Sequence, residues 1–332
     1  MVEFAFLTKV VAGLKRVKLA RWIGDGRRSR KPGPENGSFG VEDAGDEAAD
    51  RRGRVYIVGA GPGDPGLLTL KGKRCLEEAD VIVYDYLVNE DIVAHGRPDA
   101  ERVRLGKPGS AGRLSQDAIN RLLVRRAGEG KVVVRLKGGD PFIFSRGGEE
   151  AEALAGAGVA FEIVPGVTSA IAVPGYAGIP LTHRHMASSV AFVTGHEDST
   201  KEASGIDWKA VAGMGTVVFL MGVSRLSQIV ARLVEEGRAP ETPVAVIEWG
   251  TWPQQRTATA TLRDIREKAK GMGRPAVIVV GEVVRLRNRL AWFKELPASR
   301  RATEATRQQG AAPTEALKAW PSLPFVQRGL GP

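Results

Sequence analysis

Residues 59–66 read GAGPGDPG and follow the apolar run Val55–Val58. A glycine-rich turn directly behind a strand is typical of a loop in which something comes close to the backbone. The dinucleotide-binding pattern G-x-G-x-x-G would place a pyrophosphate at this loop. Here Asp64 replaces the last glycine, and Pro62 has no N–H to donate. Because a carboxylate repels phosphates, the sequence argues against an ordinary dinucleotide site.

Similar loops recur along the chain. Glycine-bearing segments follow four further apolar runs, and they read LKGGDPFIF (136–144), VPGVTSAIAVPG (164–175), FLMGVS (219–224) and IEWGT (247–251). A purely structural turn would explain one such loop but not the recurrence. Ligands of α/β proteins bind outside the carboxyl ends of strands. The five loops therefore predict a crevice that admits a folded, mostly uncharged ligand.

Between residues 53 and 296, apolar runs alternate with helical patterns, which predicts an α/β fold. The expected strands are 55–58, 81–84, 102–105, 132–136, 161–164, 190–194, 216–220, 244–248 and 277–280. The expected helices are 70–79, 115–129, 149–157, 167–177, 225–236 and 262–270. We expect Ser115 to cap the second helix and Asp117 to lie in its first turn.

Residues 175–189 lack clear periodicity and suggest a boundary between two α/β domains with the ligand crevice between them. The expected domains are 53–178 and 179–296. Residues 1–52 form a basic extension and 297–332 a tail, and their Gly-, Pro- and charge-rich composition predicts that both are flexible.

Composition excludes several classes of protein. The single cysteine, Cys75, rules out a disulfide framework, fits a cytoplasmic protein, and is expected in the core of its helix. No uncharged apolar run reaches the roughly 18 residues of a membrane-spanning helix. Residues 53–296 hold 32 Lys and Arg against 28 Asp and Glu, so they contribute only +4 of the net charge of +10. The basic balance is therefore weak evidence for a nucleic-acid partner.

The residues at these loops resemble those of the tetrapyrrole methylases. The segments that carry the resemblance are VYIVGAGPGDPGLLTLKG (55–72), LKGGDPFIFSRGGEE (136–150), VPGVTSA (164–170) and GIPLTHR (178–184). Within the superfamily they are most similar to the enzymes that methylate uroporphyrinogen III twice, at C-2 and C-7, to give precorrin-2 for sirohaem and cobalamin. The resemblance spans about residues 53–295 and implies a homodimer with two α/β domains.

The resemblance also implies S-adenosylmethionine as methyl donor, with S-adenosylhomocysteine as product. The positions that match the family's cofactor contacts are Pro62, Gly138, Gly139, Asp140, Ile143, Thr168, Ser169, Met221, Gly250 and Ala276. This cofactor carries no phosphate, so an acid and a proline in the opening loop are no handicap. Its cationic groups tolerate a carboxylate such as Asp140, and no metal is required.

The acceptor is a reduced tetrapyrrole with eight carboxylate arms, and alkylation at a pyrrole carbon must be followed by loss of a proton. The resemblance implies that Asp85 is the proton acceptor and Lys107 the donor. Arginines in or beside the expected crevice loops are candidates for binding the substrate carboxylates. They are Arg113, Arg135, Arg146 and Arg184. His183 and His185 have a spacing seen in metal sites, but no second cluster of ligands supports a metal.

Three alternatives stay open at this point. A later corrin-ring methyltransferase would share the fold and the cofactor loops. A dinucleotide-binding oxidoreductase would use Asp85 to hold a ribose hydroxyl. A nucleic-acid methyltransferase of similar fold would fit the basic pI.

Overall fold

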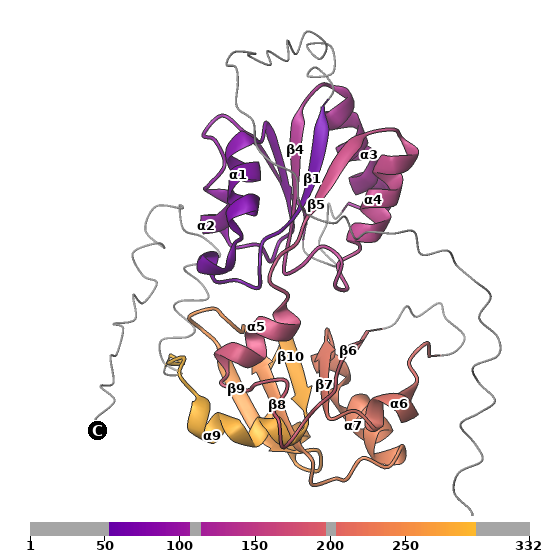
Figure 1. Cartoon of the computed structure of the whole chain (residues 1–332), viewed down its shortest axis with the longest axis vertical. Coiled ribbons are helices and arrows are strands. Elements are labelled where there is room, and N and C mark those ends of the chain that lie inside the picture. The colour runs from indigo at the N-terminus through magenta and orange to yellow at the C-terminus, as the bar shows by residue number, and fades with distance from the viewer. Residues whose placement is uncertain (1–52, 107–113, 197–203, 297–332) are drawn as a thin grey trace, which may run out of the picture. The chain divides into compact units, whose positions relative to one another are not determined.

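The computed structural model describes residues 53–106, 114–196 and 204–296, and it has α-helices packed on two five-stranded sheets (Figure 1). The expected α/β class is confirmed. The expected flexible segments 1–52 and 297–332 lie outside the described residues, as does Lys107. In the described ranges, no helix has the length and apolar character needed to span a bilayer.

The first sheet is entirely parallel and has the strand order β3-β2-β4-β1-β5. Its strands are β1 (Arg54–Gly59), β2 (Val81–Tyr84), β3 (Glu101–Arg104), β4 (Val132–Lys137) and β5 (Ala160–Val164). All five were expected within one residue at either end. Gly59 pairs with Lys137, Val58 with Val164, and Tyr84 with Leu136. The loops after β1, β2, β4 and β5 therefore leave the sheet at one edge.

Helices cover both faces of this sheet. They are α1 (Leu70–Glu78), α2 (Glu90–Val93), α3 (Gln116–Gly128) and α4 (Gly147–Gly156), with a short 3-10 turn η1 (Pro65–Leu67) after β1. Residues of α1 and α2 pack with Val58 and Ile82 on one face, and residues of α3 and α4 pack with Ile57 and Val83 on the other (Figure 1). The alternation of side chains along each strand explains the two cores.

The expected cap is confirmed, because Ser115 Oγ accepts a hydrogen bond from the Ala118 N–H, and Asp117 lies in the first turn of α3. Cys75 is on the buried side of α1, in the core as expected, and burial raises the pKa of its thiol to about 11. The sequence did not predict α2, because a four-residue helix is too short to show a period.

The second sheet is mixed and has the order β6-β7-β10-β8-β9. Its strands are β6 (Val190–Thr194), β7 (Thr216–Leu220), β8 (Pro243–Glu248), β9 (Arg256–Thr261) and β10 (Ala276–Val280). Only β6 and β7 are parallel neighbours; β10 runs antiparallel to both β7 and β8. Ala276 pairs with Glu248, and Val277 with Leu220, so β10 starts at the edge where β7 and β8 end. Strand β9, an edge strand reading RTATAT, was not predicted.

Helices also cover both faces of the second sheet. The helices are α5 (Ser169–Tyr176), α6 (Trp208–Ala212), α7 (Leu226–Glu235), α8 (Ile265–Lys268) and α9 (Arg287–Leu290), with 3-10 turns η2 (Val223–Arg225) and η3 (Glu282–Leu286). Residues of α6, α7 and α8 share one core, while α5 and η3 share the other. Of these, α8 is shorter than the expected 262–270, and α6 and α9 were not predicted. The domain boundary at residue 178 stays a prediction, although α5, which precedes it, packs on the second sheet.

Three glycine loops meet backbone to backbone at the carboxyl edge of the first sheet. A Cβ on Gly59 would lie 2.6 Å from the carbonyl oxygen of Gly139 and 2.6 Å from the Cα of Gly166. A Cβ on Gly166 would lie 2.3 Å from the same Gly139 oxygen. No side chain fits at these positions, so the glycines are required by packing and not only by turn geometry.

We predict that Gly166→Ala lowers the free energy of unfolding by about 1–3 kcal/mol, the usual cost of forcing an extra methyl group into a packed site. Gly148, in the first turn of α4, is the matched control, since within the described chain its Cβ would meet nothing closer than 4 Å. Gly148→Ala should be neutral or slightly stabilising. Urea unfolding of both variants measures the difference, and equal stabilities would contradict the packing argument.

Candidate active site

The loops after β1 and β4 are bonded to each other at the carboxyl edge of the first sheet. The Gly61 N–H donates to the Gly139 carbonyl oxygen (3.1 Å), and the Gly139 N–H donates to that of Gly61 (2.7 Å). Both glycines have positive φ angles, 79° and 69°, which favour glycine. The position of a Gly139 Cβ is 3.7 Å from the Ser169 nitrogen, so the start of α5 lies beside this pair. Expected cofactor positions in three loops are thereby neighbours.

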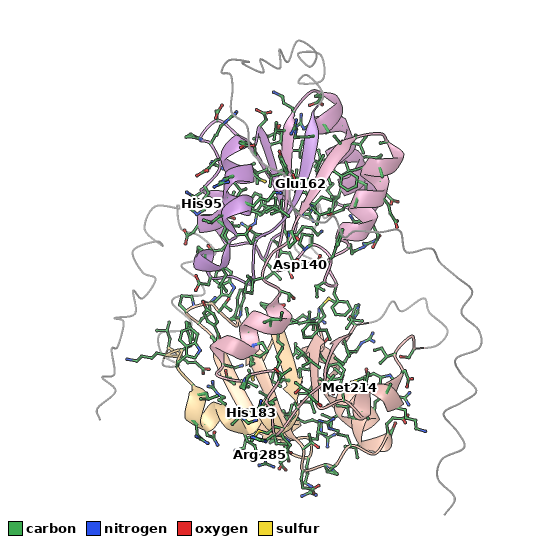
Figure 2. The ribbon with its side chains drawn as sticks, in the orientation of Figure 1. His95, Asp140, Glu162, His183, Met214 and Arg285 are labelled. Atoms are coloured by element: carbon green, nitrogen blue, oxygen red, sulfur yellow. The ribbon has the colours of Figure 1, made fainter. Side chains whose placement is uncertain are left out.

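Asp140 joins two of these loops through its carboxylate. Its Oδ1 accepts from the Phe142 N–H (2.8 Å), and its Oδ2 accepts from the Gly166 N–H (3.0 Å). Figure 2 labels Asp140 at the end of the strands of the first sheet. Asp140, which is expected to contact the cofactor, therefore also fixes the shape of the two loops that it joins.

Asp64, the acid that breaks the dinucleotide pattern, is 8% exposed, and both its side chain and its backbone are hydrogen-bonded. Its Oδ1 accepts from the Gly66 N–H (2.7 Å) and its Oδ2 from the Tyr176 hydroxyl (2.5 Å). Its own N–H donates to Thr251 Oγ1 (3.3 Å). Burial, with the bond to Asp64, raises the pKa of Tyr176. The carboxylate of Asp64 ties the opening loop to α5, and its backbone N–H ties the same loop to the loop after β8.

The edge of the second sheet carries the remaining expected positions. Met221 follows β7, Gly250 follows β8, and Ala276 begins β10. A Cβ on Gly250 would lie 2.2 Å from a methyl carbon of Val173, so this loop packs directly on α5. Ile143, from the loop after β4, packs against the core that α5 shares with the second sheet.

Trp252 connects the loop after β8 to the opening loop after β1. Its Nε1 donates to the Pro62 carbonyl oxygen (3.2 Å), and the ring occupies the space that a Cβ on Gly63 would need. The loops after β1 and β8, from different sheets, are therefore in contact. All ten residues expected to bind the cofactor lie in these loops, in α5 and its N-cap, or at the start of β10.

Backbone strain is concentrated in the same loops. In the described ranges, five residues other than glycine have positive φ, and all follow β4, β7 or β8. They are Phe144 (51°), Arg146 (63°), Met221 (58°), Trp249 (49°) and Thr251 (70°). Such conformations cost energy and cluster at functional sites. Strain is thus a second indication, independent of the glycines, that these loops form the site.

Asp85 directly follows β2, and its side chain is 29% exposed. Its Oδ1 accepts from Arg135 Nη2 at 2.5 Å. Arg135 was one of four candidates for binding the substrate carboxylates, and the structure places it in the interior of the protein. Its side chain is 3% exposed, and two protein carboxylates, Asp85 and Glu150, already pair with its guanidinium.

Of the other three arginines that are candidates for substrate binding, the structure describes two. Arg146 is exposed and pairs with Glu149, whereas Arg113 lies outside the described residues. Arg184 precedes β6, in the turn closed by the bridge between His183 and Ala187. That turn lies at the edge where β6 and β7 begin, opposite the one that carries Met221 and Gly250. Figure 2 labels His183 there, apart from Asp140.

His183 and His185 contact each other, since His183 Nδ1 accepts from the His185 N–H (3.3 Å). Within the described ranges, no group of three or more His, Cys, Asp and Glu side chains could hold a metal ion.

Sequence reasoning missed three residues that hold the site loops together, namely Tyr176, Thr251 and Trp252. Each makes its bond to a residue more than 100 positions away in the chain. The only local signal was their position: Thr251 ends one quoted loop (247–251), and Tyr176 and Trp252 directly follow the quoted loops 164–175 and 247–251.

Comparison with known proteins gives a consistent result. Residues 54–266 match the family model described as Tetrapyrrole (Corrin/Porphyrin) Methylases. The chain is 53% identical over 237 residues to an S-adenosyl-L-methionine-dependent uroporphyrinogen III methyltransferase of Methanosarcina barkeri, covering 70% of this chain and 93% of that protein. It is 51% identical over 247 residues to a siroheme synthase of Neisseria meningitidis, covering 74% of this chain but only 50% of the relative. The chain thus spans about half the length of that larger protein.

Solved structures agree with the sequence relatives. The uroporphyrin-III C-methyl transferase of Thermus thermophilus, complexed with S-adenyl homocysteine, matches with a TM-score of 0.61 and 44% identity. The match covers 70% of this chain and 99% of the other.

We predict that Tyr176→Phe lowers the free energy of unfolding at pH 7 by about 1–3 kcal/mol, because it removes a hydrogen bond to a buried carboxylate. The folded-state pKa of Tyr176 is raised above the ordinary value of 10.0. The stability it contributes is therefore fully present below pH 10 and is lost as the pH rises toward the folded-state pKa. Denaturant unfolding of both proteins between pH 7 and 11 measures this. A difference that does not shrink above pH 10 would contradict the assignment.

Proposed function

Because the chain belongs to the tetrapyrrole methylase family, we propose that it is an S-adenosylmethionine-dependent C-methyltransferase acting on uroporphyrinogen III. The reaction adds methyl groups at C-2 and C-7 and gives precorrin-2. The observation that carries this proposal is the 53% identity to the Methanosarcina barkeri enzyme, which extends over 93% of that protein. The half-length match to siroheme synthase supports sirohaem as one use of the product.

The loop geometry supports the cofactor assignment. S-adenosylmethionine has no phosphate, so the opening loop needs no anion site, and its carboxylate Asp64 is already occupied by Tyr176 and Gly66. Glycine loops bring backbone groups to one place, where they can bond the polar ends of the cofactor. Met221 is 45% exposed and offers a flexible apolar surface to an adenine ring. We propose that all ten residues expected from the family resemblance contact the cofactor.

The reaction joins a pyrrole carbon to the methyl carbon as the carbon–sulfur bond breaks, leaving S-adenosylhomocysteine. The methylated carbon already carries an acid arm and has no hydrogen, so the resulting cation must lose a proton from another position of the macrocycle to restore conjugation. We propose that Asp85 accepts this proton, since its carboxylate is partly exposed at the same sheet edge as the cofactor loops. Lys107 would donate a proton elsewhere on the macrocycle; it lies outside the described residues.

We further propose that the enzyme is a cytoplasmic homodimer and binds no nucleic acid. The near-balanced charge of residues 53–296 supports the last point. The family resemblance supports the dimer, and the presence of one buried cysteine supports a reducing compartment.

The test of function is direct. Purified full-length chain, incubated anaerobically with S-adenosylmethionine and freshly reduced uroporphyrinogen III, should yield a methylated chromophore with two added methyl groups by mass. Calorimetric titration should show binding of S-adenosylhomocysteine and none of NAD. No methylated product, or tight binding of NAD alone, would overturn the proposal.

Two methionines of similar exposure allow a matched comparison between the expected cofactor site and another part of the surface. Met221 is 45% exposed beside the glycine loops, and Met186 is 38% exposed in the turn before β6. We predict that Met221→Ala weakens S-adenosylhomocysteine binding by roughly 5- to 30-fold, the equivalent of losing most of a buried methionine side chain. Met186→Ala should leave the Kd unchanged. Equal effects in the two variants would exclude Met221 from the adenine site.

A further inference from the structure

Four charged side chains form one cluster beneath the carboxyl edge of the first sheet. Arg135 and Lys137 lie on the same face of β4, Glu150 comes from the first turn of α4, and Asp85 follows β2. Arg135 Nη2 donates to Asp85 (2.5 Å) and Arg135 Nε to Glu150 (2.9 Å). Lys137 Nζ donates to Glu150 (3.0 Å). The two cations and two carboxylates balance in charge.

This cluster is buried except at one end. The side chains of Arg135, Lys137 and Glu150 are 3%, 2% and 0% exposed, while that of Asp85 is 29% exposed. Alternation along β4 places Arg135 and Lys137 on the face of Val133, whose core includes Leu123 and Leu154. Burying ion pairs in an apolar core seldom adds stability over packed apolar residues. Asp85 is the one member that can reach a ligand.

The guanidinium of Arg135 is held on all three of its nitrogens. Besides Asp85 and Glu150, its Nη1 donates to the Leu136 carbonyl oxygen (3.1 Å), which also accepts from the backbone N–H of Asp85 (3.2 Å). The planar fork cannot rotate without breaking one of these bonds. Arg135 therefore fixes the carboxylate of Asp85 from below, through both side chain and backbone.

Glu150 is in turn held from three directions. It accepts from Arg135 and Lys137, and Gln116 Nε2 of α3 lies 3.2 Å from its Oε1. Burial and the neighbouring Arg135 lower the pKa of Lys137. Glu150 thus anchors the guanidinium between two helices and the sheet.

We propose that Arg135 is a positioning residue for Asp85, with Glu150 as its anchor, so that the cluster sets the orientation and charge of the proton acceptor. The inference rests on the proposed function and assigns roles to two residues outside the catalytic and cofactor positions that the family resemblance implies. Arg135 and Glu150 touch neither substrate nor cofactor; they act through Asp85. Substituting them should slow the proton-transfer step without weakening the binding of the cofactor.

The experiment is a double-mutant cycle in the full-length protein, read out as the single-turnover rate of methylation and the Kd for S-adenosylhomocysteine. Asp85→Asn should slow methylation about 100- to 10,000-fold, the range that a general base contributes. Arg135→Gln should slow it by about 100-fold, as expected when a reacting group is misplaced. The double variant should be no slower than Asp85→Asn alone, and each Kd should stay within about twofold of the wild type.

Further variants keep the test decisive. Glu150→Gln should lower the rate in the same coupled way, and Arg135→Lys, which keeps the charge but not the fork, should recover only part of it. If Arg135→Gln does not fold, the cycle is run with Arg135→Lys. Arg232→Gln is the control, since it breaks an exposed pair with Glu235 on α7 and should change nothing.

Three results would overturn the inference. They are multiplicative losses in the double variant, weakening of cofactor binding in parallel with the rate, and a normal rate for Asp85→Asn. The proposed function fails separately, if the wild-type protein itself yields no methylated product.

Discussion

The direct contact of three backbones at one sheet edge is the constraint on which the candidate site depends. Gly59, Gly139 and Gly166 approach so closely that a methyl group on Gly59 or Gly166 would overlap a neighbouring backbone. This contact is possible because β1, β4 and β5 are adjacent and parallel, so that their loops start at the same height. Asp140 and the paired bonds of Gly61 then lock the arrangement. The site is therefore largely made of main chain, which explains why its residues are small.

The second sheet contributes further loops to the candidate site, and these loops are also held by close contacts. Its mixed topology brings the start of β10 to the edge where β7 and β8 end. The loop after β8 reaches the opening loop through Trp252 and Thr251, and it rests on α5 through Gly250. Loops from both sheets are thus held by specific hydrogen bonds and by packing too close for any side chain larger than hydrogen.

Local patterns were sufficient to predict much of this. Nine of the ten strands were expected from apolar runs, several of them continuous runs of Val and Ile, and the five loops from the glycines behind such runs. Strand β9 was missed because alternating Thr and Ala, flanked by charged residues, is only weakly apolar. Asp64 was expected to disfavour a phosphate, but its hydrogen-bond partner Tyr176, 112 residues away, was not predicted. Arg135 was kept among four candidates for substrate binding, although its place inside a run of aliphatic residues pointed to burial rather than to a ligand.

The short connector before α5 restricts where the chain can accept inserted or deleted residues. The N-cap of α5, Thr168, and its first residue, Ser169, lie beside the glycine contact of the first sheet, and its later residues lie in a core of the second sheet. Only Pro165, Gly166 and Val167 separate β5 from its cap, and Gly166 is bonded to Asp140. A connector of three residues that is fixed at its middle residue cannot change its length without moving the elements at its ends. An added or deleted residue there would shift one set of loops against the other by about 3 Å. Insertions and deletions should therefore be excluded from this tripeptide, whatever variation the surface loops accept.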